Sequence, residues 1–115
     1  MKTVLLIYVG LLFCGGCGPP MTGREKVLFG AMCAAQWADY ETTRRCVSAG
    51  AQELNPALGD HPSDDSIALF KASVLLAIWG LGEIWPSERE GFYTIGIVSG
   101  GSAALWNDYN YENNR

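Results

Sequence analysis

The sequence is poor in the residues from which most catalytic and metal centres are built. Its 115 residues include one histidine, His61, and four cysteines, of which Cys14 and Cys17 lie in the apolar N-terminal stretch. The sequence has no Gly-x-Ser-x-Gly nucleophile motif, no phosphate-binding loop and no clustered cysteine metal site. Motifs therefore assign no catalytic, cofactor-binding or metal-binding residue, and we expect the chain not to be an enzyme.

Positive charge is also scarce. The chain has 8 Lys and Arg residues against 12 Asp and Glu, which gives a net charge of −4. Such a chain lacks the basic surface that binds nucleic acid or anionic lipid headgroups, so we expect no nucleic-acid partner. No stretch alternates apolar and polar residues for long enough to predict a β-sheet. The length after the N-terminal stretch is enough for one small core.

The first residues have the layout of a secretory signal. Lys2 supplies the positive charge, and the apolar run from Val4 to Phe13 has the expected length of about ten residues. This run is too short to cross a bilayer, which takes about twenty apolar residues. Small residues follow it, as they do before a signal-peptidase site. The sequence therefore predicts export.

The end of this segment, Gly15-Gly16-Cys17, resembles the lipobox of bacterial lipoproteins. The resemblance implies that residues 1–16 are a lipoprotein signal peptide and that residues 17–115 form a lipid-anchored helical domain. Cys14 departs from the pattern, which usually has an aliphatic residue at that position. An ordinary cleaved signal and an uncleaved anchor are the alternatives.

Lipidation of Cys17 makes membrane lipid the first expected partner, through acyl chains at the N-terminus. The location that the resemblance implies is the cell membrane, with the chain anchored on the periplasmic side. Gly18 follows the cysteine where Asp would retain a lipoprotein in the inner membrane. By the same resemblance, this favours the outer membrane in a Gram-negative cell.

Three later segments are predicted to be helices, and the first begins with a capping box of Thr22 and Glu25. The apolar stretch from Val27 to Ala38 follows the box. Cys33 and Cys46 both fall on this helix, about 20 Å apart at 1.5 Å per residue. A disulfide needs Cα atoms within about 7 Å, so we expect no bridge between them; intermolecular pairing is the alternative to two buried or half-buried thiols.

The second predicted helix starts at the N-cap Ser63 and is apolar nearly all round from Ile67 to Trp85, until Pro86 ends it. A helix without a polar face is either the centre of a bundle or lies in a membrane. Lys71, near its start, could extend toward the membrane surface. Both environments remain open, and we favour a bundle with some membrane-embedded helix.

The third predicted helix starts with a capping box of Ser87 and Glu90 and is apolar from Phe92 to Trp106. Gly96 and Gly100 form a small-x-x-x-small pair, which lets two helices approach closely. The polar tail beyond the apolar stretch is expected to fray. The predicted fold class is all-α, a small three-helix bundle after an N-terminal lipoprotein signal peptide.

The connection between the first two helices carries a second resemblance. It reads Asn55-Pro56-Ala57-Leu58-Gly59-Asp60-His61-Pro62-Ser63 and is preceded by Glu53. This arrangement resembles small lipoproteins and membrane proteins of bacteria and their phages. Those proteins also tend to have an Asp and a Thr about four residues apart, seen here within Asp39–Arg44, and a late asparagine, which matches Asn107 or Asn110 loosely. The group has no known activity, so the resemblance implies placement and architecture only.

Ionisable residues in such a chain mark either a functional site or a satisfied structural pair. The candidates are Asp39, Glu53, His61, Lys71, Glu83 and Asp108. The first four could converge at one end of an antiparallel helix pair, where Asp, Glu and His could bind a divalent cation or polarise a water. In the structural alternative, which we favour, His61 lies on a solvated turn, Asp39 pairs with Arg44 or Lys71, and Glu53 caps backbone amides.

Two functions follow from these observations. The first is a membrane-associated lipoprotein with a structural or interaction role in the cell envelope, or in the host envelope if a phage encodes it. Its partner would be another envelope or membrane protein, bound through aromatic and small-residue helix faces. The second is a small membrane hydrolase or divalent-cation-binding protein that uses Asp39, Glu53 and His61, which requires these side chains to share a pocket.

Overall fold

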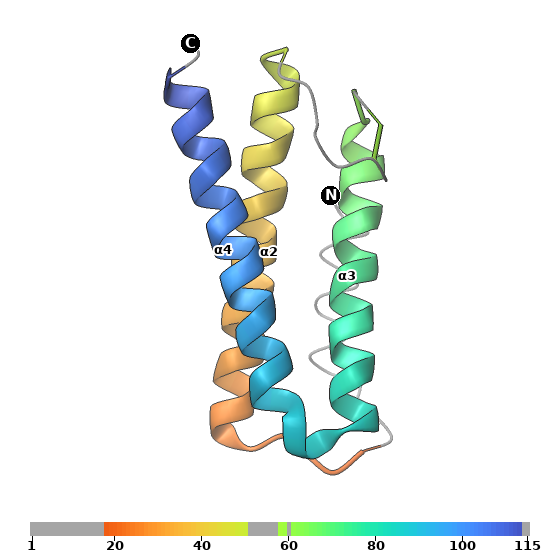
Figure 1. Cartoon of the computed structure of the whole chain (residues 1–115). Helices are drawn as coiled ribbons and strands as arrows, with labels where there is room; N and C mark the ends of the chain where they lie inside the picture. Colours follow the sequence, from red (N-terminus) through yellow and green to blue (C-terminus); the bar gives the residue numbers. More distant parts are fainter. Residues whose placement is uncertain (1–17, 51–57, 60, 114–115) are drawn as a thin grey trace.

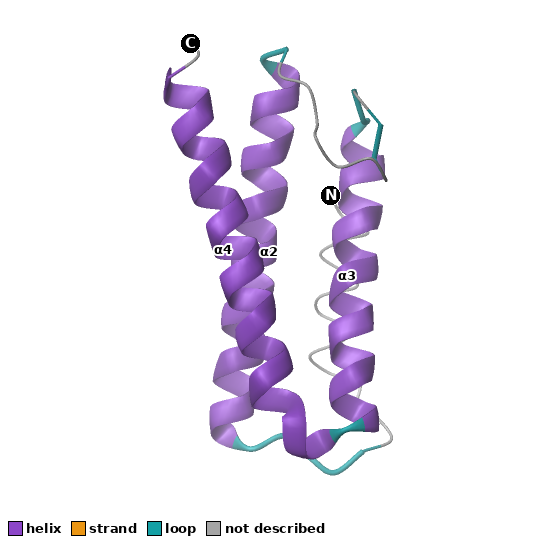
Figure 2. Ribbon diagram, in the orientation of Figure 1, coloured by secondary structure: helices purple, strands orange, loops and turns teal. Residues whose placement is uncertain are grey.

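The structure is a computed structural model that describes residues 18–50, 58–59 and 61–113. Three long helices lie side by side: α2 (Gly23–Ser48), α3 (Asp64–Ile84) and α4 (Arg89–Asn113). Helices α2 and α4 run in the same direction, α3 runs opposite to both, and the short 3-10 turn η1 (Pro86–Glu88) joins α3 to α4 (Figure 1). The described part of the chain contains helices and loops and no strand (Figure 2). The predicted all-α three-helix bundle is confirmed.

The first two helices begin where the sequence predicts. The Thr22 hydroxyl accepts a hydrogen bond from the Glu25 amide, and the Glu25 carboxylate accepts one from the Thr22 amide, which completes the capping box. The Ser63 hydroxyl accepts a hydrogen bond from the Ser66 amide at the start of α3. Each cap satisfies an amide that the first helical turn leaves unpaired, and is worth about 1 kcal/mol.

The third helix differs from the prediction at both ends. Its expected capping box of Ser87 and Glu90 is replaced by η1, where Pro86 occupies the first turn and no side chain caps the amides. The polar tail, which was expected to fray, is helical as far as Asn113, the last described residue. Asn107, the first residue of that tail, is held by hydrogen bonds to α2. Local polarity predicted a loose end, and a contact between helices overrides it.

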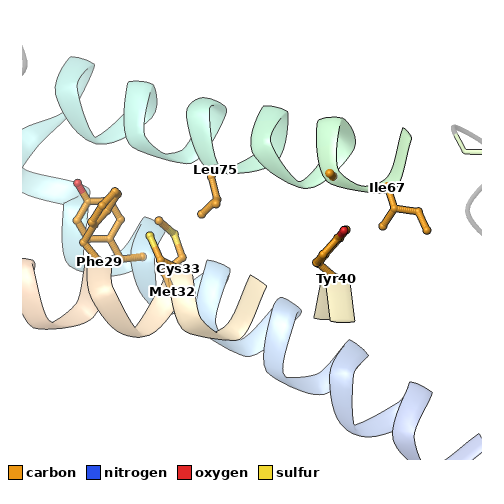
Figure 3. Close-up of a cluster of buried hydrophobic side chains, with 8 residues drawn as sticks. Phe29, Met32, Cys33, Tyr40, Ile67 and Leu75 are labelled. Carbon is orange, nitrogen blue, oxygen red and sulfur yellow. The ribbon is translucent and has the colours of Figure 1, made fainter. Parts of the chain in front are cut away.

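The apolar core runs along the line where the three helices face one another. Its buried members are Phe29, Met32, Cys33, Tyr40, Ile67, Ala68, Leu75 and Tyr93. In the close-up of this cluster, Leu75 and Ile67 of α3 extend toward the helix that carries Phe29, Met32 and Tyr40 (Figure 3). Phe29 packs edge-to-face on Tyr93 of α4, with ring centroids 5.3 Å apart. Cys33 and Cys46 are not bridged to each other, as the spacing predicted.

Helices α2 and α4 approach each other closely at two glycines. A Cβ built on Gly100 would lie 2.9 Å from the backbone carbonyl carbon of Ala35, and one built on Gly96 would overlap the side chain of Met32. The Gln36 amide donates a hydrogen bond to the Gly96 carbonyl, 2.9 Å away, across the same contact. The small-x-x-x-small pair therefore joins α4 to α2 within the chain, and α2 covers the small-residue face that was expected to bind a partner.

Candidate functional site: two buried polar clusters

Four polar side chains from three helices meet in what we call the Asp39 cluster: Asp39, Thr43, Lys71 and Asn107. Asp39 is 4% exposed and lies on the buried side of α2. One of its oxygens forms an ion pair with the ammonium group of Lys71 on α3. Its other oxygen accepts hydrogen bonds from the Thr43 hydroxyl and the Asn107 amide, each at 3.2 Å. The Asp39 carboxylate therefore connects all three helices.

Asn107 forms the α4 side of this cluster. Its amide nitrogen also lies 2.9 Å from the Thr43 hydroxyl and 3.2 Å from the Thr42 hydroxyl. An amide has two N–H groups, so the three acceptors around this nitrogen share them. The backbone carbonyl of Asn107 accepts a further bond from the Cys46 thiol at 3.2 Å. These bonds hold the last third of α4 against α2.

The Asp39 cluster contains two of the four residues of the site predicted from the sequence, Asp39 and Lys71. Asp39 and Lys71 meet as expected, and they meet as an ion pair, which is the structural alternative. His61 is exposed on the turn before α3, and Glu53 lies outside the described residues. Within residues 18–50, 58–59 and 61–113, no three His, Cys, Asp or Glu side chains gather closely enough to hold a metal ion. Because Lys71 neutralises Asp39, this carboxylate is not a free base or metal ligand.

Arg44, the other partner considered for Asp39, is engaged elsewhere. Its guanidinium lies 2.9 Å from the Glu41 carboxylate and 3.8 Å from that of Asp64. The hydrogen bond from Arg44 to Glu41 and the charge of Glu41 raise the pKa of this guanidinium. Of the two ion pairs expected for Asp39, with Arg44 or with Lys71, the structure contains the one with Lys71.

A groove with a volume of about 470 Å³ lies at the same end of the molecule. It is lined by Glu41, Thr42, Arg44, Arg45, Ser48, Ala49 and Tyr111. Arg45 forms an ion pair with Asp108, and its guanidinium carbon lies 4.7 Å from the centre of the Tyr111 ring. Both arginines of the groove are paired with carboxylates, so their charge is largely compensated. Asp108, a candidate from the sequence, belongs to this exposed pair.

A second buried cluster lies at the opposite end and consists of Arg89, Glu25 and Glu83; we call it the Arg89 cluster. Arg89 is 2% exposed, although it begins α4. Its guanidinium lies 2.9 Å from the Glu83 carboxylate of α3 and 3.6 Å from the Glu25 carboxylate of α2. Its Nε donates a hydrogen bond to the Gly82 carbonyl at 3.0 Å. One guanidinium therefore ties three helices together at their lower ends (Figure 1).

The segment before α2 rests on the same cluster. The Gly18 amide donates a hydrogen bond to Glu83 Oε2 at 2.9 Å, and the Thr22 amide donates one to Glu25 Oε2 at 2.9 Å. A Cβ built on Gly18 would lie 2.9 Å from Glu83 Oε2 and 3.0 Å from Arg89 Nη2. The fit is therefore tight enough to favour glycine at this position. Residue 17, the predicted lipidation site, lies outside the described residues.

The sequence pointed to Glu83 but missed Arg89. Arg89 follows Pro86 in a short polar stretch with two acids, Glu88 and Glu90, which is the pattern of an exposed helix start. Its partner Glu83 is six residues away across a turn, and Glu25 is on another helix. Neither distance matches the helical i, i+3 or i, i+4 spacing that local patterns detect. The feature of the sequence that indicated this cluster was Glu83, an acidic residue in the last turn of an otherwise apolar stretch.

The fold and the two clusters define the class of molecule: a three-helix bundle with paired charges in its interior. No protein-family model matches the chain, and no curated protein or solved structure is significantly similar to it. The resemblance to bacterial and phage lipoproteins therefore rests on its motif residues. Among those, Asp39 and Thr43 of α2 meet Asn107 of α4, which is more than sixty positions away in the sequence.

Proposed function

We propose that this chain is a lipoprotein anchored through Cys17, whose bundle is embedded in a membrane of the cell envelope and acts there as a structural or interaction protein. The polarity of the bundle carries this proposal. Its buried polar residues are Gln36, Asp39, Thr43 and Arg89. Its outer surface carries large apolar side chains, such as Leu69 on α3 (68% exposed) and Leu105 on α4 (75% exposed). Charged groups that pair in the interior below an apolar surface are typical of membrane proteins.

The charges along each helix support the same proposal. Residues 27–38 of α2 and 91–107 of α4 contain no Asp, Glu, Lys or Arg, and residues 66–82 of α3 contain only Lys71. Lys71 is directed inward, to Asp39. At 1.5 Å per residue these stretches are about 18 to 26 Å long. The stretches of α3 and α4 approach the thickness of the hydrocarbon core of a bilayer, about 30 Å, and that of α2 is shorter.

Helix α3 is the strongest single element in this argument. Of the described helices, only α3 is long and apolar enough to cross a membrane by itself. Only 28% of its 18-residue apolar stretch is buried inside the bundle. The apolar core helix of a water-soluble bundle would be mostly buried. An exposed apolar helix in contact with lipid avoids the cost of solvating that surface.

The state of the charged groups favours a structural or interaction role over catalysis. Asp39 is saturated by Lys71 and by two further hydrogen bonds, and Arg89 is held by two carboxylates and a carbonyl. Charged groups that are paired with other groups of the protein stabilise one arrangement of the helices. A general base or nucleophile needs an atom that is free to meet a substrate.

The anchor is tested by metabolic labelling with a palmitate analogue. We expect the unsubstituted chain and Cys14→Ala to be labelled and Cys17→Ala to be unlabelled. The Cys14 variant is the matched control, because it removes the neighbouring thiol and keeps the lipobox glycines. Label on Cys17→Ala, or no label on any form, would rule out the proposed anchor.

Embedding is tested separately by carbonate extraction of membranes. Since Cys17→Ala keeps its uncleaved signal, residues 1–17 are first replaced by a plain export signal that is removed completely. We expect the resulting unlipidated bundle to stay with the membrane at alkaline pH. Its release into the soluble fraction would show that the bundle is a tethered water-soluble domain.

A further inference from the structure

Two tryptophans of the described chain are exposed, and they lie at opposite ends of the bundle. Trp85 follows the last residue of α3 and is 52% exposed. Trp106 is 60% exposed and lies toward the far end of α4, at the opposite end of the bundle in Figure 1. Trp79, in contrast, packs against the apolar core. The outer surface therefore carries one large amphipathic ring at each end.

The zone between these two rings has nearly the length of the hydrocarbon core of a bilayer. From Arg89, the first residue of α4, to Trp106 the helix rises about 26 Å. The hydrocarbon core is about 30 Å thick. Tryptophan is enriched at both of its boundaries, where the ring contacts the acyl chains and its N–H contacts polar groups. The positions of Trp85 and Trp106 match the two boundaries of one bilayer.

The charges are complementary to the same arrangement. Along α4, no charged residue lies between Glu90 and Asp108, which are about 27 Å apart along the helix. At intermediate depth, Asp39 and Lys71 pair with each other in the interior of the bundle. The exposed zone is therefore apolar, and exposed charges lie only where the headgroups of a bilayer would be.

Helix α2 is the shortest of the three in this comparison. Lys26 and Glu41 bound its apolar face and are about 22 Å apart along the helix. The lysine side chain can extend its ammonium group toward the headgroups, while its methylene groups stay in the apolar layer. A bilayer also thins around a short segment at a modest cost in free energy. The length of α2 is thus compatible with the span of α3 and α4.

We propose that the bundle crosses the bilayer completely, with Trp85 in one interface and Trp106 in the other. This inference rests on the proposed embedding and adds a topology to it. The Arg89 cluster lies at one face of the membrane, and the groove beside Arg44 and Arg45 lies at the opposite face. A partner in one aqueous compartment can therefore reach only one of these two ends.

Two identical substitutions test the crossing. Ser48 and Ser87 are both exposed; Ser48 ends α2, and Ser87 lies in η1 at the other end of the bundle. Ser48→Cys and Ser87→Cys are made in the full chain and treated with a membrane-impermeant maleimide in sealed membrane vesicles of uniform orientation. The unsubstituted chain gives the background from its own cysteines. We expect one variant to be labelled above background in sealed vesicles, and both after the vesicles are opened with detergent.

Labelling of both variants in sealed vesicles would place both ends on the outside and overturn the crossing. Labelling of neither before opening and of both afterwards would place both ends inside, with the same conclusion. Carbonate extraction of the unlipidated bundle reports on embedding independently. A bundle that resists extraction with both serine positions on one side would be embedded without crossing, so the proposed function would stand while this inference fails.

Brominated lipids test the depth of the tryptophans. The full chain is reconstituted in phosphatidylcholine vesicles with bromine either near the headgroup or near the end of the acyl chain. We expect Trp85→Phe and Trp106→Phe each to remove fluorescence that the shallow bromines quench most strongly. Trp79→Phe, which changes a ring packed against the core, should leave that fraction unchanged. Stronger quenching of Trp85 or Trp106 by the deep bromines would overturn their interfacial position.

Discussion

Lys71 and Asp39 form the buried ion pair that links α3 to α2, and their side chains are 14% and 6% exposed. Removal of one partner from such a pair leaves the other charge buried and alone, which costs about 3–5 kcal/mol. We therefore expect Lys71→Met to lower the free energy of unfolding by about that amount, measured by denaturant titration in detergent. Lys26→Met, at an exposed position of α2, should change it by less than about 0.5 kcal/mol.

A double substitution separates the cost of an orphaned charge from the value of the pair. Replacement of Asp39 by Leu together with Lys71→Met removes both charges and leaves apolar side chains of similar size. Such replacements are often neutral, so we expect the double variant to recover most of the stability that Lys71→Met loses. A double variant as unstable as the single one would show that the charges themselves stabilise the fold.

Single residues also mark the limit of prediction from sequence. The pairing of Asp39 with Lys71 could be proposed because both are rare charges near the same end of neighbouring apolar helices. The contribution of Asn107 could not, because the polar residues around it resemble a frayed tail, and its partners are on α2, more than sixty positions away. The burial of Arg89 could not be predicted for the same reason, because its partner Glu25 is on another helix, far away in the sequence. Buried polar networks depend on tertiary geometry that local patterns do not contain.

At the scale of whole elements, the most specific contact is that of α4 with α2 at Gly100. The added methyl group of Gly100→Ala would meet the backbone of Ala35, which cannot rotate away as a side chain can. We expect this substitution to lower the free energy of unfolding by about 1–3 kcal/mol. Gly101→Ala, one position further along the same helix, meets open space. It should raise stability by up to about 1 kcal/mol, because alanine favours the helix.

The same measurements on both variants check this prediction, since the helix propensity change is identical and only the neighbours differ. Equal effects would mean that the helices are free to separate at this point.

Glycine spacing predicted a close helix contact but not its partner, because a small-x-x-x-small pair fits another chain as well as a neighbouring helix. Caps were predicted well for α2 and α3, where the signal is local, and poorly for α4, where the turn η1 and the buried Arg89 decide the start.

Across the whole molecule, the charged residues separate into two ends with an apolar zone between them. One end has the Arg89 cluster and the exposed pair of Arg24 with Glu90, and the other has the ion pairs of Arg44 and Arg45. The sequence predicted three helices in this order, and the short connection through η1 makes α4 antiparallel to α3. Whether lipid or water surrounds the apolar zone depends on which side chains point outward, and that is set by the packing of the helices.

Val98 offers a direct test of that environment, because it lies near the middle of the charge-free stretch of α4 and is 60% exposed. In a bilayer, an aspartate there costs about 2.5–3.5 kcal/mol of insertion free energy. We expect Val98→Asp to reduce sharply the fraction of the unlipidated bundle that resists carbonate extraction. Tyr109→Asp, 62% exposed but outside the charge-free stretch, should leave that fraction unchanged. In water both positions are exposed surface, so both variants would be neutral within about 0.5 kcal/mol. Equal behaviour of the two variants would therefore argue for a water-soluble bundle held at the membrane by its lipid alone.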